Sequence, residues 1–237
     1  MACGEWLWGA ALQIEWLDTK AGQALFRQEC LLAQAVLERV FGDQIVQVGS
    51  WGSPRGLLEA ARTQAALLVV GATDEPGDAW SKPERLAIRT DSVDAVLLPH
   101  TLEHTTDPHG VLREVHRILR PDGRLIVLGF NPYSWWGTRH QLSLSGFPAG
   151  IRRHISRRRL KDWLRLLNLN IDEVRPCYVA PARNGVMRLF QRSGYFASGY
   201  LLMARKQTIP VTVVRPRLGR RAALVKGWVN SPTRNVA

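Results

Sequence analysis

The chain has 237 residues, of which 46% are hydrophobic and 22% are charged. That composition is typical of a globular protein with one sizeable core, and it excludes a disordered or fibrous chain. Lysine and arginine number 32 against 20 acidic residues, for a formal net charge of +12. A field of this sign attracts nucleic acid, anionic lipid or an acidic substrate, although a solvated surface with a basic tail explains it equally well.

The cysteines and the apolar runs indicate a protein of the cytoplasm. Cys3, Cys30 and Cys177 are widely spaced and form neither a CxxC pair nor a disulfide framework, so we expect reduced thiols. Cys30 lies in an apolar helical run, which favours core packing over a nucleophilic role. No apolar run approaches the roughly 20 residues that span a bilayer, and the first residues lack the basic start of a signal peptide.

Apolar periodicity and capping residues predict the elements in chain order. Apolar residues at helical spacing, or an N-cap followed by proline, predict helices over residues 23–40, 54–64, 108–119 and 156–167. Short apolar or alternating runs predict strands at residues 44–49, 65–71, 92–99, 123–130, 170–179 and 195–206. Residues 72–84 are rich in Gly, Pro and Asp and are expected to form a loop, as is the turn Pro121-Asp122-Gly123.

This order of elements predicts an α/β fold, with a mostly parallel sheet, helices on both faces and an antiparallel C-terminal strand. We divide the chain into a helical extension (1–42), a main domain (43–207) and a basic tail that we expect to be flexible (208–237). Ligands of such sheets bind at the carboxyl ends of the strands. The segments to inspect are therefore residues 49–53, 72–74, 99–106 and 130–136.

Residues 91–132 carry a series of short motifs in a fixed order. They are Ser92-Val93-Asp94, Leu102-Glu103-His104, Asp107-Pro108, Arg117-Ile118-Leu119-Arg120-Pro121-Asp122-Gly123 and Leu125-Ile126-Val127. In order and spacing, this series resembles the class I S-adenosylmethionine-dependent methyltransferases, especially the type 11 branch that includes quinone-biosynthesis enzymes. The resemblance implies a Rossmann-like methyltransferase fold for the main domain and S-adenosylmethionine as the cofactor, but it does not name the methyl acceptor.

The resemblance places the cofactor against the loop after the first strand and against the ends of the next two strands. The implied cofactor-binding residues are Gln47, Gly49, Ser50, Trp51, Gly52, Thr73, Asp74, Pro99, His100 and Thr101. Gln47 and Thr73 stand where the family has acids, and Ser81 or Lys82 lies near the acid that usually meets the adenine. Trp51 replaces the second glycine, for which Gly52 is a substitute. The ring of Trp51 therefore turns outward, stacks on the cofactor or closes the crevice.

Methyl transfer to a hydroxyl or an acidic carbon needs a base, and His104 is our candidate because its charge changes near neutral pH. A histidine that only holds the loop is an equally good interpretation. Asn131, Tyr133, Trp135 and Trp136 are expected to line the acceptor pocket; a turn and buried packing are the simpler alternatives. Residues 100–104 also spell HxxEH, an inverted zinc-protease motif, but nothing before them caps a helix, so we expect a loop without metal.

The segment IRRHISRRRL, residues 151–160, concentrates positive charge. It has too few apolar residues to bury, so we expect either contact with a polyanion or a solvated helix start. The side chains concerned are Arg152, Arg153, Arg157, Arg158 and Arg159.

The favoured function is methyl transfer to a small-molecule acceptor. The alternative is a degenerate methyltransferase fold that holds nucleic acid or an anionic membrane through its basic half. A nucleic-acid methyltransferase is a weaker third hypothesis, because Leu98-Pro99-His100-Thr101 lacks the Asn-Pro-Pro-aromatic pattern expected there.

Overall fold

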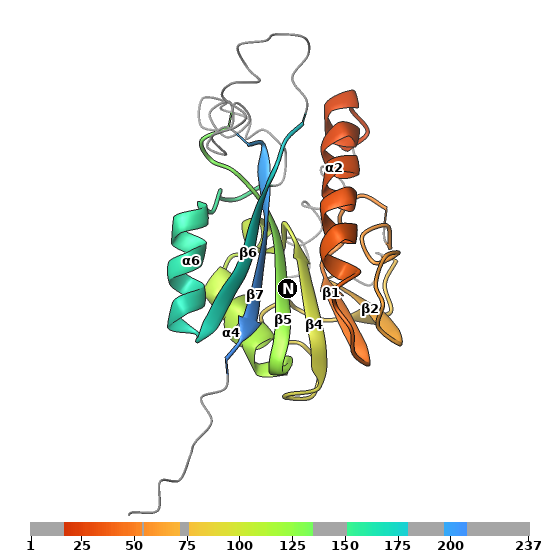
Figure 1. The fold of residues 1–237 in the computed structure, drawn as a ribbon, viewed down its shortest axis with the longest axis vertical. Helices are drawn as coiled ribbons and strands as arrows, with labels where there is room; N and C mark the ends of the chain where they lie inside the picture. The colour runs from red at the N-terminus through yellow and green to blue at the C-terminus, as the bar shows by residue number, and fades with distance from the viewer. Residues whose placement is uncertain (1–16, 54, 72–75, 135–150, 180–196, 208–237) are drawn as a thin grey trace, which may run out of the picture.

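The computed structural model describes residues 17–53, 55–71, 76–134, 151–179 and 197–207. These residues form a single twisted sheet with helices packed on both of its faces (Figure 1). The strands lie in the order β3-β2-β1-β4-β5-β7-β6. The chain order reverses between β1 and β4, and in open α/β sheets ligands bind at the carboxyl edge of such a switch point.

The seven strands confirm the predicted sheet. They are β1 (Gln44–Val48), β2 (Ala65–Val70), β3 (Ala79–Trp80), β4 (Val93–Pro99), β5 (Leu119–Phe130), β6 (Leu169–Cys177) and β7 (Gly199–Lys206). Neighbours from β3 to β5 pair in parallel, whereas β7 is antiparallel to both β5 and β6. The mostly parallel sheet with an antiparallel C-terminal strand is therefore confirmed.

Two helices begin at their predicted capping residues, Asp107 and Ser156, whereas the first helix begins at Lys20, three residues before its predicted start. The helices are α2 (Lys20–Leu37), the single turn α3 (Thr101–His104), α4 (Pro108–Ile118) and α6 (Arg157–Leu166). Thr19 caps α2 by accepting from the Gly22 N–H at 3.1 Å, and Asp107 caps α4 by accepting from the Gly110 N–H at 2.9 Å. Ser156 caps α6 in the same way. None of the helices in the described ranges is long and apolar enough to cross a membrane.

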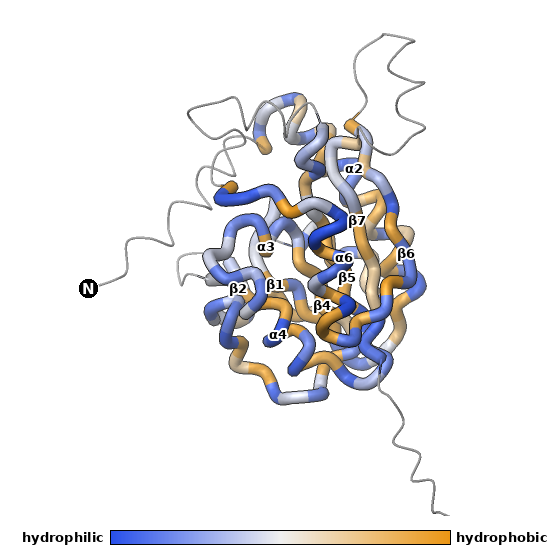
Figure 2. The backbone as a smooth tube through the Cα atoms, turned by 90° about the vertical axis from the view of Figure 1, so that its left-hand side faces the viewer, coloured by the Kyte–Doolittle hydropathy of each residue, from blue (hydrophilic) through white to orange (hydrophobic). Residues whose placement is uncertain are grey.

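Two apolar layers hold the helices to the sheet. Alternate strand residues point to opposite faces, so Val46 and Val96 face α4 and α6, whereas Ile45 and Leu97 face α2. Figure 2 shows the apolar strands β4 and β5 in the middle of the molecule. Because α2 covers its face of the sheet, its inward residues lie directly over the ends of the central strands.

The structure overturns the predicted helix over residues 54–64. Residues 55–60 form turns with bonds of the i to i+3 type, such as that from the Leu58 N–H to the Arg55 carbonyl at 2.8 Å. Leu57 and Leu58 are both buried, and the segment packs beside Phe26 of α2. Both leucines belong to the same apolar cluster as α2, so the segment shares this face of the sheet with that helix. Gly56 lowers the helix propensity of the segment.

Four smaller predictions were also wrong. The predicted loop 72–84 contains the short strand β3, and strand β5 begins at Leu119, so it includes the turn predicted at residues 121–123. Residues 101–104 form the helix α3 rather than a loop, with His100 in the left-handed region at φ 55°. Finally, the arginine-rich segment does bury apolar side chains, because Ile151, Ile155 and Leu160 all lie in the core.

Candidate active site at the carboxyl edge of the sheet

The ends of β1, β4 and β5 meet at one edge of the sheet. Gly49, directly after β1, donates its N–H to the Val69 carbonyl at 2.8 Å, and His100, directly after β4, donates to the Leu128 carbonyl at 3.0 Å. The Thr101 hydroxyl donates to the Val48 carbonyl, which ties α3 to the loop after β1. The sequence-predicted residues 47–52 and 99–101 are therefore brought together.

The glycines of the loop have different neighbours. Gly49 has φ 94°, and a Cβ there would lie 2.9 Å from Thr101 Oγ1, so only glycine fits without strain. Gly52 has φ 63° and faces α2, where a Cβ would meet the Phe26 ring at 2.5 Å. A hollow of about 370 Å³, lined in part by Phe26, Gly52 and Ser53, opens beside the loop. Gly49 thus lets the loop lie close to α3, and Gly52 lets it lie close to Phe26 of α2.

The buried side chain of Gln47 has an oxygen that accepts no hydrogen bond from the described residues. Its side chain is fully buried, and its Nε2 donates to the Gly49 carbonyl at 3.0 Å. Its Oε1 has no hydrogen-bond partner among the described residues. Buried oxygens without partners are rare because their desolvation is uncompensated. An acceptor at this place, beside the glycine loop, therefore suits a ligand that brings a donor.

A buried network of three ionisable side chains joins α2 to the end of β4. His100 Nε2 lies 2.9 Å from Glu29 Oε1, and His100 Nδ1 lies 2.8 Å from Glu103 Oε2. Glu103 Oε1 also accepts from the Phe130 N–H at 2.9 Å. All three side chains are at most 2% exposed. Glu29 was not predicted from the sequence, although a glutamate on the apolar face of a helix was the signal that could have found it.

The carboxylates decide the charge of the buried histidine. Burial alone would lower the pKa of His100, but the carboxylates of Glu29 and Glu103 outweigh it and raise that pKa to about 9. Burial raises the pKa of Glu103 as well, against the bonds from His100. His100 is thus an imidazolium at neutral pH, and both ring nitrogens are already engaged. Among the residues that the structure describes, no group of three metal-ligating side chains is placed to hold a metal ion.

Trp51 points into the molecule rather than outward. Its indole N–H donates to Glu29 Oε2 at 2.7 Å, and the residue is 2% exposed. The Trp51 ring centroid lies 4.1 Å from that of His100, which lies 4.2 Å from that of Phe130, and the Trp51 and Phe130 rings meet edge to face at 5.9 Å. The imidazolium therefore contacts two aromatic rings, which favours its charge. The indole fills the space between α2 and the ends of β4 and β5.

The predicted catalytic and acceptor-side residues lie around this cluster. His104 ends α3, is partly exposed, and has its ring 6.4 Å from that of Trp51. Asn131 is buried and forms a turn, in which its Oδ1 accepts from the Tyr133 N–H at 3.2 Å, whereas Tyr133 is 62% exposed. Pro99 is the buried last residue of β4, and Ser50 is half-buried. Thr73, Asp74, Trp135 and Trp136 lie outside the described residues, as does the tail 208–237.

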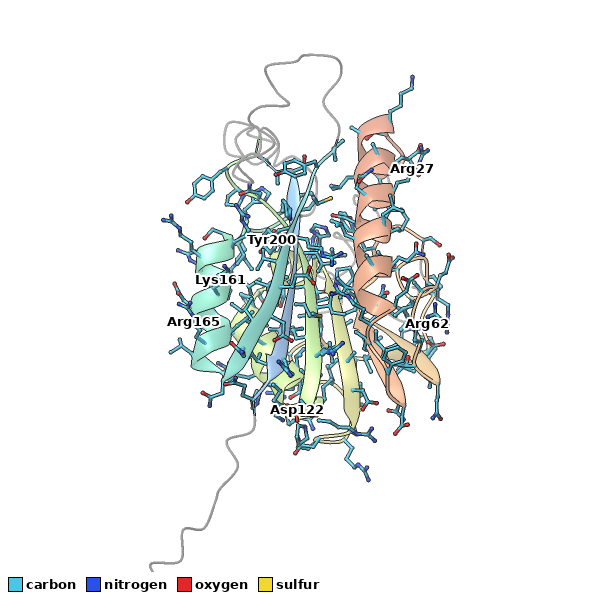
Figure 3. All side chains as sticks on the ribbon, in the orientation of Figure 1. Arg27, Arg62, Asp122, Lys161, Arg165 and Tyr200 are labelled. Atoms are coloured by element: carbon cyan, nitrogen blue, oxygen red, sulfur yellow. The ribbon has the colours of Figure 1, made fainter. Side chains whose placement is uncertain are left out.

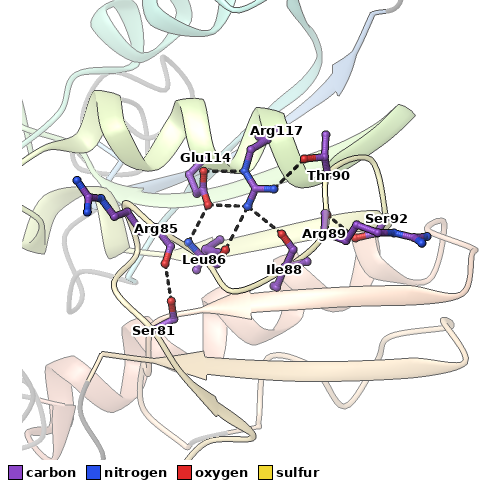
Figure 4. Close-up of polar contacts among 9 residues, drawn as sticks. All are labelled: Ser81, Arg85, Leu86, Ile88, Arg89, Thr90, Ser92, Glu114 and Arg117. Carbon is purple, nitrogen blue, oxygen red and sulfur yellow. Dashed lines mark hydrogen bonds and ion pairs between the residues drawn. The ribbon is translucent and has the colours of Figure 1, made fainter.

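The segment after β3, near the expected adenine side, is strapped to α4 (Figure 4). Glu114 accepts from the Leu86 N–H at 2.8 Å, and Arg117 donates to the carbonyls of Leu86 and Ile88 at 3.1 and 2.8 Å. The Arg117 guanidinium also pairs with Glu114 at 2.7 Å, which lowers the pKa of that carboxyl. These bonds fix residues 86–88 against the helix whose N-terminus follows α3.

Comparisons with known proteins agree with this geometry. A family model described as a methyltransferase domain (Methyltransf_11) matches residues 60–127. The uncharacterized protein YafS of Escherichia coli is 37% identical over 147 residues, which are 61% of this chain and 61% of that protein. The matched part thus spans about three fifths of this relative.

Solved structures share the fold at low sequence identity. One chain of a Haloferax volcanii complex containing the Trm112 methyltransferase activator is 16% identical, with a TM-score of 0.61 over 83% of this chain and 98% of that one. Geranyl diphosphate C-methyltransferase of Streptomyces coelicolor, whose structure includes S-adenosyl-L-homocysteine, is 16% identical. Its TM-score is 0.55, over 76% of this chain and 80% of that one.

The strand order, the antiparallel hairpin at the β5 side and the glycine loop after β1 define the class I methyltransferase fold. S-adenosylmethionine is the cofactor of this class. Within it, residues 60–127 are similar to the type 11 methyltransferase domain.

Proposed function

We propose that this chain is an S-adenosylmethionine-dependent methyltransferase acting on a small-molecule acceptor. The observation that carries the proposal is the pairing of Gly49, at φ 94°, with the partnerless buried oxygen of Gln47 at the carboxyl end of β1. The reduced-thiol pattern of the sequence favours a cytoplasmic location. Residues 43–207 are the proposed catalytic domain, and the preceding segment contributes Glu29 to it.

Three residues of the β1 and β4 ends suit the methionine end of the cofactor. S-adenosylmethionine supplies an electrophilic methyl group when bound. Gln47 Oε1 is placed to accept a hydrogen bond from an ammonium group, as the acid of the family does with a full charge. Gly49 lets the loop lie directly against Thr101, whose hydroxyl holds that backbone in position. Trp51, stacked on His100, excludes water from the inner side of the site.

His104 is the proposed base on the acceptor side. It is less buried than His100, and its ring lies at the rim of the aromatic cluster, so it can meet an acceptor proton. His100 cannot serve, because both its nitrogens are bonded to carboxylates. The exposed Tyr133, with Trp135 and Trp136, is proposed to contact the acceptor, and Asn131 holds the turn that carries Tyr133.

Calorimetric titration of the full chain with S-adenosylmethionine and S-adenosylhomocysteine tests the proposal. A hydrogen bond to a charged group is worth roughly 1.5–3 kcal/mol, so Gln47→Leu should weaken binding by about ten- to a hundredfold. Gln47→Glu, which restores the acid of the family, should strengthen it. Gln44→Leu, at the exposed start of the same strand, is the matched control and should change nothing. No heat with the parent at saturating cofactor would instead favour a fold that serves only as a binding module.

A further inference from the structure

The arginine-rich segment crosses the molecule directly beside the proposed active site. The backbone N–H groups of Arg152 and Arg153 both donate to the Glu103 carbonyl, at 3.0 and 3.4 Å. Ile151 and Ile155 are buried, and the Tyr200 hydroxyl donates to the Ile155 carbonyl at 2.9 Å. The segment is therefore fixed on α3, one residue from His104, and on β7.

The arginine side chains of this segment point to solvent from an anchored backbone. Arg152, Arg153, Arg158 and Arg159 are exposed, and one nitrogen of Arg153 donates to the Thr106 carbonyl at 3.1 Å. Among the described residues, no carboxylate lies within 4.0 Å of Arg152, Arg153 or Arg159. By contrast, Arg117 on α4 pairs with Glu114, and Arg120 on β5 pairs with Asp94. The guanidinium groups of Arg152, Arg153 and Arg159 are thus left for an external anion.

Helix α6 continues the same positive surface. Its N-terminus, capped by Ser156, follows the arginine pair, and the positive end of its dipole adds to their field. Figure 3 shows Lys161 and Arg165 on this helix, on the opposite side of the molecule from Arg62. Leu160 and Leu164 are packed against the sheet, and Leu166 at the end of the helix is its one large exposed apolar side chain, too little to insert into a bilayer. This arrangement favours an anion in solution over a lipid surface.

We propose that Arg152, Arg153 and the first turn of α6 form a binding site for a phosphate-class group of the methyl acceptor. This inference rests on the proposed function, because it names the acceptor class of that same site. Guanidinium groups match phosphate oxygens with two parallel hydrogen bonds, which gives both affinity and orientation. The backbone bonds from Arg152 and Arg153 to the Glu103 carbonyl hold the backbone of both arginines beside α3, which ends at His104. The acceptor is therefore an organophosphate whose reacting atom meets His104 while its phosphate lies on the arginines.

Calorimetric titration of the full chain with pyrophosphate, without cofactor and at low ionic strength, tests the site. The double variant Arg152→Gln/Arg153→Gln should weaken pyrophosphate binding at least about tenfold, because both bidentate partners are lost. The control Arg62→Gln/Arg89→Gln removes the same charge from exposed positions elsewhere and should stay within about twofold of the parent. Thermal unfolding of each variant confirms that the fold is intact.

Three outcomes would overturn the proposal. Pyrophosphate that fails to bind the parent removes the site. Equal weakening in both double variants means that only the overall charge attracts the anion. Binding to phosphatidylglycerol vesicles without binding to pyrophosphate replaces the small phosphate by a membrane surface. Because the titration contains no S-adenosylmethionine, its failure is distinct from failure of the proposed methyltransferase activity.

Discussion

Replacement of Glu29 by glutamine should remove most of the pH dependence that the buried histidine gives to folding. A folded-state pKa of about 9 for His100, against 6.5, corresponds to roughly 3 kcal/mol of stability. Because the pKa is raised by folding, this stability is fully present below pH 6.5 and is lost as the pH rises through 9. In Glu29→Gln, the amide oxygen can accept from Trp51 while its NH₂ donates to a neutral His100. His100 can then be neutral and still form a hydrogen bond through each ring nitrogen.

Urea unfolding at two pH values measures this effect. We expect Glu29→Gln to cost roughly 2–3 kcal/mol near pH 6.5 and clearly less near pH 9.5. Glu38→Gln, exposed near the end of the same helix, is the matched control and should cost little at either pH. If Glu29→Gln lowered the free energy of unfolding equally at both pH values, His100 would not be a charged imidazolium between two carboxylates.

Three further predictions concern Trp51, Lys206 and Cys30. Trp51→Gly should cost roughly 3–5 kcal/mol in urea unfolding. S-adenosylhomocysteine binding should nevertheless survive in the folded fraction, and its loss would show that the indole itself holds the cofactor. Lys206→Met removes an ammonium that donates to the carbonyls of His116 and Leu119 at 2.9 and 2.8 Å, so it should cost roughly 2 kcal/mol; an unchanged urea midpoint would contradict this. Burial and the Glu29 charge raise the pKa of Cys30 to about 11, so iodoacetamide should modify the folded chain on the order of 100-fold more slowly than free cysteine. Fast alkylation of Cys30 would mean an open thiol.

The sheet could be predicted from the sequence because its strands are nearly continuous apolar runs. Residues such as Val93–Pro99 can be buried on both faces only in a central strand, and the capping residues Asp107 and Ser156 fix the starts of α4 and α6 locally. The motifs of residues 91–132 depend on these same local features, so the family could be predicted with the fold.

The site could be predicted only in part, because its decisive contacts join distant segments. Gln47, Gly49 and Thr101 lie together at the carboxyl edge of the sheet, but the sequence does not show that Glu29 reaches across to His100 and Trp51. The helix predicted over residues 54–64 is replaced by turns. Leu57 and Leu58 still pack beside α2, but Gly56 lowers the helix propensity of the segment.

The most direct test of the central claim is to map where the cofactor binds. Irradiation of the full chain with methyl-tritiated S-adenosylmethionine, followed by proteolysis, locates the label by peptide. We expect label in the peptides that contain Gly49–Ser53 or Pro99–His104, and excess S-adenosylhomocysteine should displace it. Absence of label, or label elsewhere that S-adenosylhomocysteine leaves in place, would contradict a methyltransferase site at the carboxyl edge of this sheet.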